Sequence, residues 1–419
     1  MRILEVQNFS CISKASLEID RLTIIIGPQA SGKSVIGKLC YFAIDVGLSQ
    51  FSHIQKQDTL EKFTQAVKER FIEWFPISAW GSKKFKITFT AGEYSIALTR
   101  KSYRGANADD CRIKFSDNFQ AAYHESVTQV QKQDSLKKTS GMEQEFERDW
   151  RIRQIVADNF KRLMGKDNVQ SQAFVPAGRS FFTSVGKAIA AFEQGRVLDP
   201  LILRFGRMYS VLKDRPQKYF DQRATDKELR RSIDNIMATL LGGRIQRDGD
   251  KEYLESTDGR KIPISALSSG QQELLPIIAF LPWFSGGREG ALCYIEEPEA
   301  HLFPSTQSRL VQALVMAASK SSLVVTTHSP YVVTKINNLL KAGSLGRKQN
   351  DSLRKDVDSL IPRQSWLSAR TVRAYAICEG VMTPILGADG LIDADYLDEI
   401  SSDLSTEFSS LLELEERYA

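Results

Sequence analysis

The chain has 419 residues, of which 42% are hydrophobic and 26% are charged, as in an ordinary globular protein. Its formal net charge of +5 is too small to indicate a nucleic-acid partner, because a solvated surface gives the same value. Its five cysteines are far apart without a CxxC pair, which argues against a zinc site or a disulfide framework. No apolar stretch approaches the roughly 18 residues that cross a membrane, and the N-terminus lacks a signal-peptide pattern, which excludes a transporter unless a separate membrane subunit exists. The separated cysteines fit a reducing compartment, so we expect a cytoplasmic protein without a membrane partner.

The first predicted elements are strands at residues 2–7, 15–19 and 22–26, the last a β-branched run typical of a strand buried on both faces. A helical pattern covers residues 35–43. Between them lies a complete GxxxxGK[ST] motif, formed by Gly27, Pro28, Gln29, Ala30, Ser31, Gly32, Lys33 and Ser34. The order of strand, glycine loop and helix is that of a phosphate-binding P-loop, and it disfavours a chance glycine-rich turn.

The spacing of this motif has a chemical reason. Gly27 and Gly32 let the backbone fold round a phosphate, and the amides of residues 30–34 form an anion nest at a helix N-terminus. Lys33 would reach the β- and γ-phosphates, and the Ser34 hydroxyl would bind Mg²⁺.

The middle of the chain predicts a β-hairpin at 84–100 and then mainly helix, at 117–170 and 183–242. Long heptad repeats are missing, so any helical arms must be short. Basic runs such as Lys132–Lys138 could grip nucleic acid, but acidic residues interrupt them and solvated faces are the favoured interpretation. Trp150 is either a stacking residue or a core anchor.

A second set of motifs follows. Ser268, Ser269, Gly270 and Gln271, after Leu267, open a helical pattern at 272–280 and resemble the LSGGQ signature, with Ser269 in place of its first glycine. They would offer a hydroxyl and a helix-terminal amide to a γ-phosphate. The same residues are also a plausible helix N-cap.

An apolar strand at 291–295 leads into Glu296-Glu297-Pro298, and a strand at 323–327 leads into His328. We assign Glu296 to Mg²⁺, Glu297 to polarising the attacking water, and His328 to the γ-phosphate or that water. The ordinary alternatives are a surface turn and a packed histidine. His301 either meets a partner subunit or packs within its own chain.

These motifs together resemble the SMC, RecF and OLD branch of the ABC ATPases. The Asn8-Phe9 turn, EEPEAHLFP at 296–304 and TTHSP at 326–330 carry the resemblance, which covers roughly residues 1–45 and 260–335. It implies an α/β ABC-type P-loop head with an antiparallel β subdomain, a short helical insertion and a C-terminal helical extension. It also implies ATP and Mg²⁺ as cofactors, and a homodimer or higher oligomer in which each signature reaches the nucleotide of the partner.

One expected residue of the family pattern is hard to place, and a nearby arginine has two possible roles. The glutamine that couples Mg²⁺ to the lobes has no clear match, and Gln172 is our candidate. Arg179, just after it, is either a phosphate contact or a dimer contact. Four parts follow from the motifs: an N-terminal ATPase lobe at 1–116, a mainly helical insertion at 117–250, a C-terminal ATPase lobe at 251–345 and a C-terminal extension at 346–419.

The extension ends in an amphipathic helix pattern, expected to pack on its own head or else on a partner. The apolar residues of that pattern are Leu397, Ile400, Leu404, Phe408 and Leu411. Glu379 with Asp393 superficially resembles a Toprim nuclease, but their interval is too short to hold that fold.

Within the branch, the chain resembles the compact AAA-family ATPase subunits of bacterial anti-phage systems, such as AriA of PARIS and PtuA of Septu. The resemblance implies an ATPase that gates a separate nuclease or toxin. The alternatives are a RecF-like DNA-binding repair ATPase, with nucleic acid as a possible partner, and a module that binds ATP without appreciable turnover.

Overall fold

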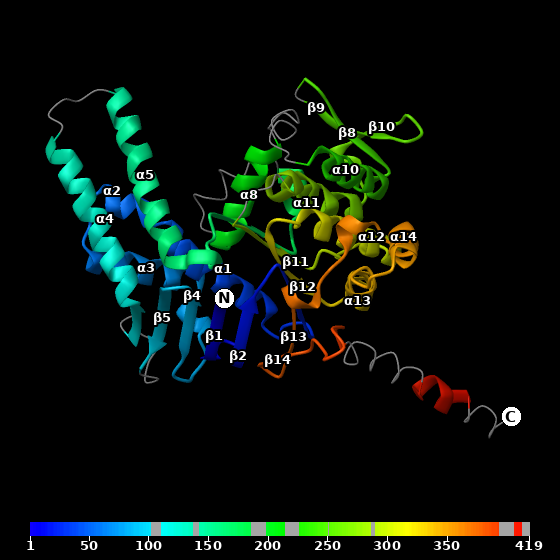
Figure 1. The fold of residues 1–419 in the computed structure, drawn as a ribbon, viewed down its shortest axis with the longest axis horizontal. Helices are drawn as coiled ribbons and strands as arrows, with labels where there is room; N and C mark the ends of the chain where they lie inside the picture. Colours follow the sequence, from blue (N-terminus) through cyan, green and yellow to red (C-terminus); the bar gives the residue numbers. More distant parts are fainter. Residues whose placement is uncertain are drawn as a thin grey trace.

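A mixed sheet of eleven strands organises the chain in the computed structural model, which describes residues 1–101, 110–136, 142–185, 198–213, 226–249, 251–285, 290–393 and 406–412 (Figure 1). The strand order is β6-β5-β4-β1-β2-β14-β13-β3-β12-β11-β7. The strands are β1 (Arg2–Phe9), β2 (Ile12–Ile19), β3 (Leu22–Ile26), β4 (Lys86–Ala91), β5 (Tyr94–Arg100), β6 (Cys111–Phe115), β7 (Ser171–Val175), β11 (Ala291–Glu296), β12 (Ser322–Thr327), β13 (Val372–Cys378) and β14 (Val381–Pro384). The predicted α/β class is confirmed.

Four parallel strands, β3, β12, β11 and β7, form the end of the sheet that positions the P-loop. Every residue of β3 is buried, as its β-branched sequence predicts for a strand covered on both faces. The register pairs Ile25 with Thr326 and Thr326 with Glu296, so the three strands β3, β12 and β11 end together. The loops that follow these strands therefore meet at one edge.

The other end of the sheet is the antiparallel wing β6-β5-β4-β1-β2. It contains the predicted hairpin as β4 and β5, joined at Gly92. Buried and less buried side chains alternate along β4 and β5, the pattern of a sheet with one face on a core.

Two C-terminal strands join the halves, which the sequence did not predict. β13 runs parallel to β3, and β14 contacts β2 through the pair Val381 and Lys14. Part of the segment assigned to a C-terminal extension thus lies inside the central sheet.

Helices cover both faces of the sheet. The helices are α1 (Lys33–Leu48), α2 (Phe51–Gln55), α3 (Leu60–Trp74), α4 (Asp117–Leu136), α5 (Met142–Met164), α6 (Phe181–Val185), α8 (Pro200–Lys213), α10 (Lys227–Leu241), α11 (Ser269–Ser285), α12 (Pro304–Ala317), α13 (Pro330–Leu345) and α14 (Asp351–Leu360). Helix α1 shares one hydrophobic core with Ile25, whereas α10 to α13 share another with Ile24 and Ile26. Neighbouring residues of a strand point to opposite faces, so α1 and α11 lie on opposite sides of the sheet.

Two further features lie outside the sheet. Helices α4 and α5 form a short hairpin that extends beyond the antiparallel wing (Figure 1), which agrees with the prediction of short arms. A small antiparallel sheet, β10-β9-β8, consists of β8 (Gly243–Asp248), β9 (Lys251–Ser256) and β10 (Lys261–Pro263).

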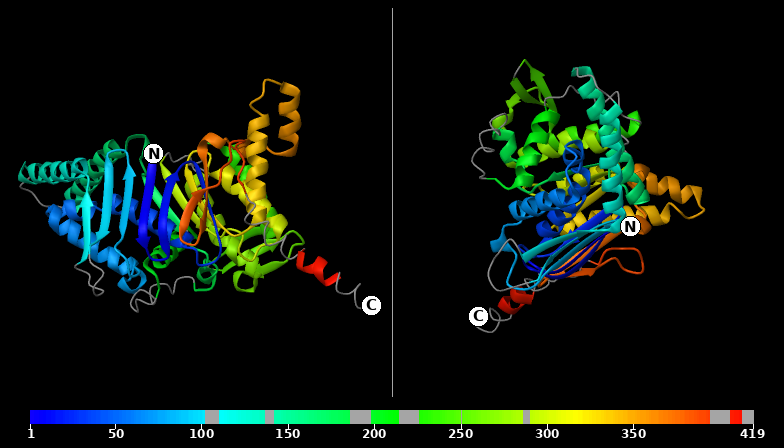
Figure 2. Two further views of the ribbon diagram at one scale, coloured as in Figure 1. Left: turned by 90° about the horizontal axis from the view of Figure 1, so that it is seen from below. Right: turned by 90° about the vertical axis from the view of Figure 1, so that its left-hand side faces the viewer.

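The described part of the tail is one helical stretch, 406–412, which lies apart from the body of the molecule (Figure 2). Phe408 and Leu411 are exposed there, so packing of this face onto its own head is not supported at these residues. Leu397, Ile400 and Leu404 lie outside the described residues. Over the described ranges, every helix is too short or too polar to cross a membrane.

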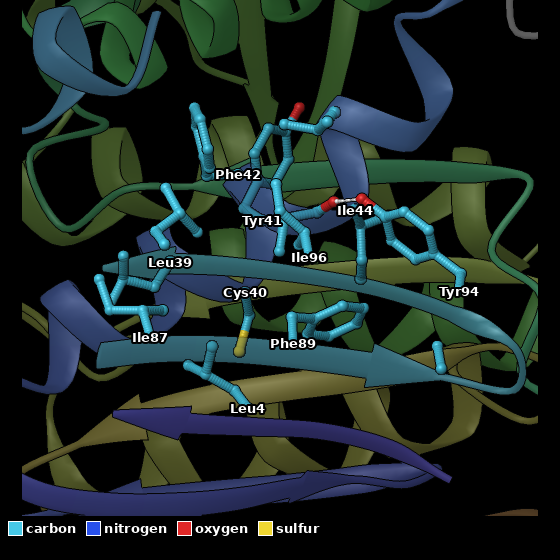
Figure 3. Close-up of a cluster of buried hydrophobic side chains, with 14 of the residues drawn as sticks. Leu4, Leu39, Cys40, Tyr41, Phe42, Ile44, Ile87, Phe89, Tyr94 and Ile96 are labelled. Carbon is cyan, nitrogen blue, oxygen red and sulfur yellow. Dashed lines mark hydrogen bonds between the residues drawn. The ribbon is translucent and has the colours of Figure 1, made fainter. Parts of the chain in front are cut away.

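The core beneath α1 joins the P-loop helix to the antiparallel wing. Figure 3 shows Leu39, Cys40 and Tyr41 of α1 beside Phe89 and other apolar residues of β4 and β5. The buried Tyr94 hydroxyl donates to the carbonyl of Ala43 at 2.7 Å, which satisfies its polar group inside this core.

The turn at Gly92 gives a test of how this wing is held. A Cβ there would lie 2.5 Å from the carbonyl oxygen of Leu163, whereas at Gly165 it would meet no described atom within 4 Å. Their φ angles are +58° and +56°, so an alanine costs similar backbone strain at both, about 1 kcal/mol. Gly92→Ala should lose roughly 1–3 kcal/mol more than Gly165→Ala in urea unfolding, because the α5 backbone must shift. Equal losses would show that α5 is not fixed against this turn.

Candidate active site

The P-loop closely surrounds the space that a phosphate would take. Gly27 has a φ of +151°, and a Cβ on it would lie 2.4 Å from the carbonyl oxygen of Ile377 in β13. At Gly32, with a φ of +103°, a Cβ would lie 2.4 Å from Cδ1 of Ile12. Both positions therefore require glycine, as the motif predicted. The loop ends at the N-terminus of α1, where free backbone amides favour an anion.

Lys33 is buried, and its Nζ donates to the carbonyls of Gly27 and Pro28 at 3.0 and 2.8 Å. Burial lowers the pKa of this ammonium, and the nearby carboxylates of Glu297, Glu299 and Glu296 oppose that shift. The two carbonyls thus keep the ammonium group of Lys33 against the P-loop.

Glu296 ends β11 and is 7% exposed. The amide of Ala177 donates to its Oε2 at 3.3 Å, while Oε1 has no hydrogen-bond partner among the described residues. Burial raises the pKa of this carboxyl, and the Ser34 hydroxyl is the largest opposing influence. A buried carboxylate with an unpartnered oxygen beside a serine hydroxyl is a hard-oxygen donor set that fits Mg²⁺. Within the described ranges no three His, Cys, Asp or Glu side chains cluster as a metal site, so the other ligands would be phosphate and water.

Glu297 and His328 lie together at the ends of β11 and β12. Nε2 of His328 is 3.3 Å from Oε1 of Glu297, and both side chains are about one-third exposed, at 33% and 37%. Glu297 takes a left-handed φ of +43°, and its amide donates to the carbonyl of Thr326 at 2.9 Å. The turn thus places two polar side chains in solvent reach at the edge where the P-loop begins.

Glu299 was not assigned a role from the sequence. Its Oε1 accepts hydrogen bonds from the Thr327 hydroxyl at 2.7 Å and the His328 amide at 2.8 Å. It therefore fixes the loop that carries His328. A third acidic residue so close to Glu296-Glu297 was the signal that could have found it.

The signature residues begin α11 as predicted. The Ser268 hydroxyl accepts from the Gln271 amide at 3.4 Å, and the Gln271 side chain accepts from the Ser268 amide at 3.0 Å, which is a reciprocal cap. A Cβ on Gly270 would lie 2.9 Å from the carbonyl oxygen of His301, so the loop after Glu299 touches the signature. His301 itself is exposed, with a φ of +58°, and does not pack in the core.

Gln172 does not lie with the carboxylates. It pairs with Leu292, the second residue of β11 and four residues before Glu296, and its Nε2 donates to the carbonyl of Tyr41 at 2.9 Å. The structure therefore gives no support to Gln172 as a residue that couples to Mg²⁺.

Arg179 is fully buried, so neither predicted role, as a phosphate contact or a dimer contact, is correct. Its guanidinium donates to the carbonyls of Glu296 and Glu297, at 2.8 and 3.1 Å. The sequence showed an arginine after a strand but not its direction, because the fold of the loop 176–179 decides where the side chain points.

A family model described as "AAA domain, putative AbiEii toxin, Type IV TA system" matches residues 22–334. No curated protein matches the chain. Among solved structures, the chain is similar to an SMC head bound to the C-terminal winged-helix domain of ScpA, at 13% identity and a TM-score of 0.45, over 91% of this chain and 96% of that one.

Two further similar structures are SMC heads. The Thermotoga maritima SMC head domain matches at 11% identity and a TM-score of 0.39, over 92% of this chain and 98% of that one. The Pyrococcus furiosus Smc head with an extended coiled coil, bound to the C-terminal domain of ScpA, matches at 12% identity and a TM-score of 0.40, over 97% and 100%. The family match spans the P-loop, the signature residues and the strands β11 and β12, and the chain belongs to the AAA-domain family that this model describes.

Proposed function

We propose that the protein hydrolyses ATP with Mg²⁺ at composite sites formed by two copies of the chain. The observation that carries this proposal is the contact of 3.3 Å between Glu297 and His328 at the strand edge where the P-loop begins. A carboxylate that can accept a proton from water thus lies beside an imidazole that can orient the same water.

The residues would divide the chemistry as follows. Lys33 and the α1 amides neutralise the β- and γ-phosphates, and Ser34 with Glu296 holds Mg²⁺, which supplies further positive charge to the phosphates. Glu297 polarises a water whose oxygen bonds to the γ-phosphorus. The bond from that phosphorus to the bridging oxygen breaks, and ADP keeps the electron pair.

A second copy would complete the site. Helices α11 and α1 cover opposite faces of the sheet and pack in different hydrophobic cores. The core packing therefore does not bring the signature at the start of α11 next to the P-loop of the same chain. Ser268 and Gly270 lie at an exposed helix N-terminus that can meet the γ-phosphate of a partner. The adjacent exposed His301 and Phe303 would lie in the same interface.

We further propose that this nucleotide-controlled dimer gates a separate nuclease or toxin, in anti-phage defence. The resemblance to the ATPase subunits of PARIS and Septu supports this role, as does the family's description by a toxin–antitoxin system. The test is whether the purified chain binds the product of a nuclease-like gene beside its own. Failure to bind it in every nucleotide state would remove the proposal.

A DNA-binding repair ATPase is the second candidate, and one observation favours it. Phe146 and Trp150 of α5 lie one turn apart and are 77% and 57% exposed, so Trp150 is not a core anchor. Exposed aromatic rings can stack on unpaired bases. However, Arg151 pairs with Glu147, and Arg148 pairs with Asp134, which leaves less positive charge for phosphates.

For that candidate, Trp150→Ala should weaken binding to single-stranded DNA by roughly 5- to 100-fold in fluorescence anisotropy, as expected for one lost stacking contact. The control is Phe408→Ala, which removes another exposed aromatic ring, in the tail. Trp366 does not serve as a control because its ring packs beside Gly346. An unchanged affinity in Trp150→Ala rules out stacking at this helix.

Lys33→Ala should weaken ATP binding roughly 10- to 100-fold in isothermal titration, because the phosphates lose a charge-assisted contact. Lys62→Ala is the matched control, since Lys62 pairs with Asp58 on the exposed side of α3. Equal affinities in the two variants would show that Lys33 does not reach the phosphates.

Glu297→Gln should bind ATP as the parent does but hydrolyse it at least about 100-fold more slowly, because the amide cannot take a proton from water. In light scattering with ATP and Mg²⁺, this variant should stay dimeric while the parent returns to monomer. Glu61→Gln, at an exposed position in the first turn of α3, should behave as the parent. Hydrolysis by Glu297→Gln at the parental rate would disprove the catalytic assignment.

A further inference from the structure

One buried guanidinium connects two loops and one helix of the candidate active site. Arg179 is 0% exposed and follows β7 by four residues. Its Nη1 donates to the carbonyls of Pro176 and Glu296 at 3.2 and 2.8 Å, and its Nη2 donates to those of Glu297 and Pro298 at 3.1 and 3.4 Å. The planar fork therefore binds three successive carbonyls of the loop that carries the catalytic glutamate.

The remaining donor of this group faces the signature helix. Nε of Arg179 donates to the backbone carbonyl of Glu273 at 3.1 Å and lies 3.2 Å from its Oε2. Glu273 is itself only 2% exposed and lies one turn after Gly270 in α11. A buried carboxylate and a buried guanidinium stabilise each other here, since either one alone would bear the cost of an unpaired buried charge.

The loop held by Arg179 is strained. Glu297 has a left-handed φ of +43°, which a residue with a side chain seldom adopts and which must be held by its surroundings. The carbonyls of Glu296, Glu297 and Pro298 all point to one rigid group, so the turn cannot relax without breaking those bonds. The direction of the Glu297 side chain depends on that turn.

We propose that Arg179 and Glu273 are positioning residues that couple the signature helix of a chain to the orientation of its own Glu297. The inference rests on the ATP hydrolysis proposed above. When a partner's nucleotide binds at Ser268 and Gly270, any movement of α11 passes through Glu273 and the planar guanidinium to the loop of Glu297. Each site then senses whether the other half of the dimer is loaded, because the signature that reads the partner's phosphate is tied to the chain's own catalytic carboxylate.

The test uses Arg179→Lys, which keeps the charge but cannot hold several carbonyls in one plane, and Glu273→Gln, which keeps the shape but removes the charge. Arg179→Lys should lower kcat at least tenfold while the Kd for ATP, measured by titration, stays within about twofold. Glu273→Gln should lower kcat less, because its backbone carbonyl still accepts from Arg179. The matched control is Arg70→Lys, which alters a half-buried arginine that pairs with the buried Asp45 at 3.2 Å.

A double variant separates positioning from general destabilisation. If Arg179 acts through Glu297, then Arg179→Lys added to Glu297→Gln should not lower the residual rate further. An unchanged kcat in Arg179→Lys would overturn the inference, as would an equal loss in Arg70→Lys or a further tenfold loss in the double variant. These outcomes differ from failure of the proposed function, which would appear as full activity in Glu297→Gln alone.

Discussion

The register of three parallel strands is the constraint on which the site depends. β3, β12 and β11 are buried on both faces and end at the same level, so the P-loop, the Glu296-Glu297 turn and His328 emerge side by side. A slip of one residue between any two of them would turn every side chain to the opposite face. The apolar, β-branched sequences of β3 and β12 keep the register, since both faces of each strand must meet a core.

Several charged side chains are buried at and next to this edge, where the loss of hydration makes a charge energetically unfavourable. Lys33, Glu296, Glu273 and Arg179 are each less than one-tenth exposed. Lys33 is stabilised by carbonyls of its own loop, and Glu296 by an amide. Arg179 and Glu273 stabilise each other, and Arg179 also donates to carbonyls. Among these groups, Oε1 of Glu296 and Oε2 of Glu273 have no hydrogen-bond partner in the described residues, and the Glu273 oxygen lies 3.2 Å from Nε of Arg179. The Glu296 oxygen, beside the Ser34 hydroxyl, is the feature expected of a group that awaits a cation.

The C-terminal strands complete this arrangement. β13 covers the open side of β3, and its Ile377 carbonyl forms part of the wall against which Gly27 lies. The P-loop is thus shaped by residues some 350 positions away in sequence, in the hairpin that superficially resembles a nuclease motif around Glu379. In this chain the hairpin serves the sheet and links β3 to the antiparallel wing through β2.

Much of this could be read from the sequence, because local chemistry fixes it. A glycine loop between a β-branched strand and a helix has one common solution, and Ser268 with Gln271 caps α11 by contacts within one turn. Glu297 and His328 were both chosen from the sequence because each follows a predicted strand, whereas their contact at 3.3 Å was found only in the structure. The sequence could not determine which residues from distant elements contact each other. In the sequence, Arg179 looks like an exposed arginine that follows a strand, and Glu273 looks like a single charged residue in an apolar helix. Only the packing of α11 over the loop after β7 brings the two side chains together. Gln172 does not lie at the strand edge, because position along β7, not residue type, decides which side chains reach that edge. Local sequence determined the loops and caps, whereas long-range packing determined which buried charges meet, because an ion pair forms only where the packing of separate elements brings its two side chains within reach.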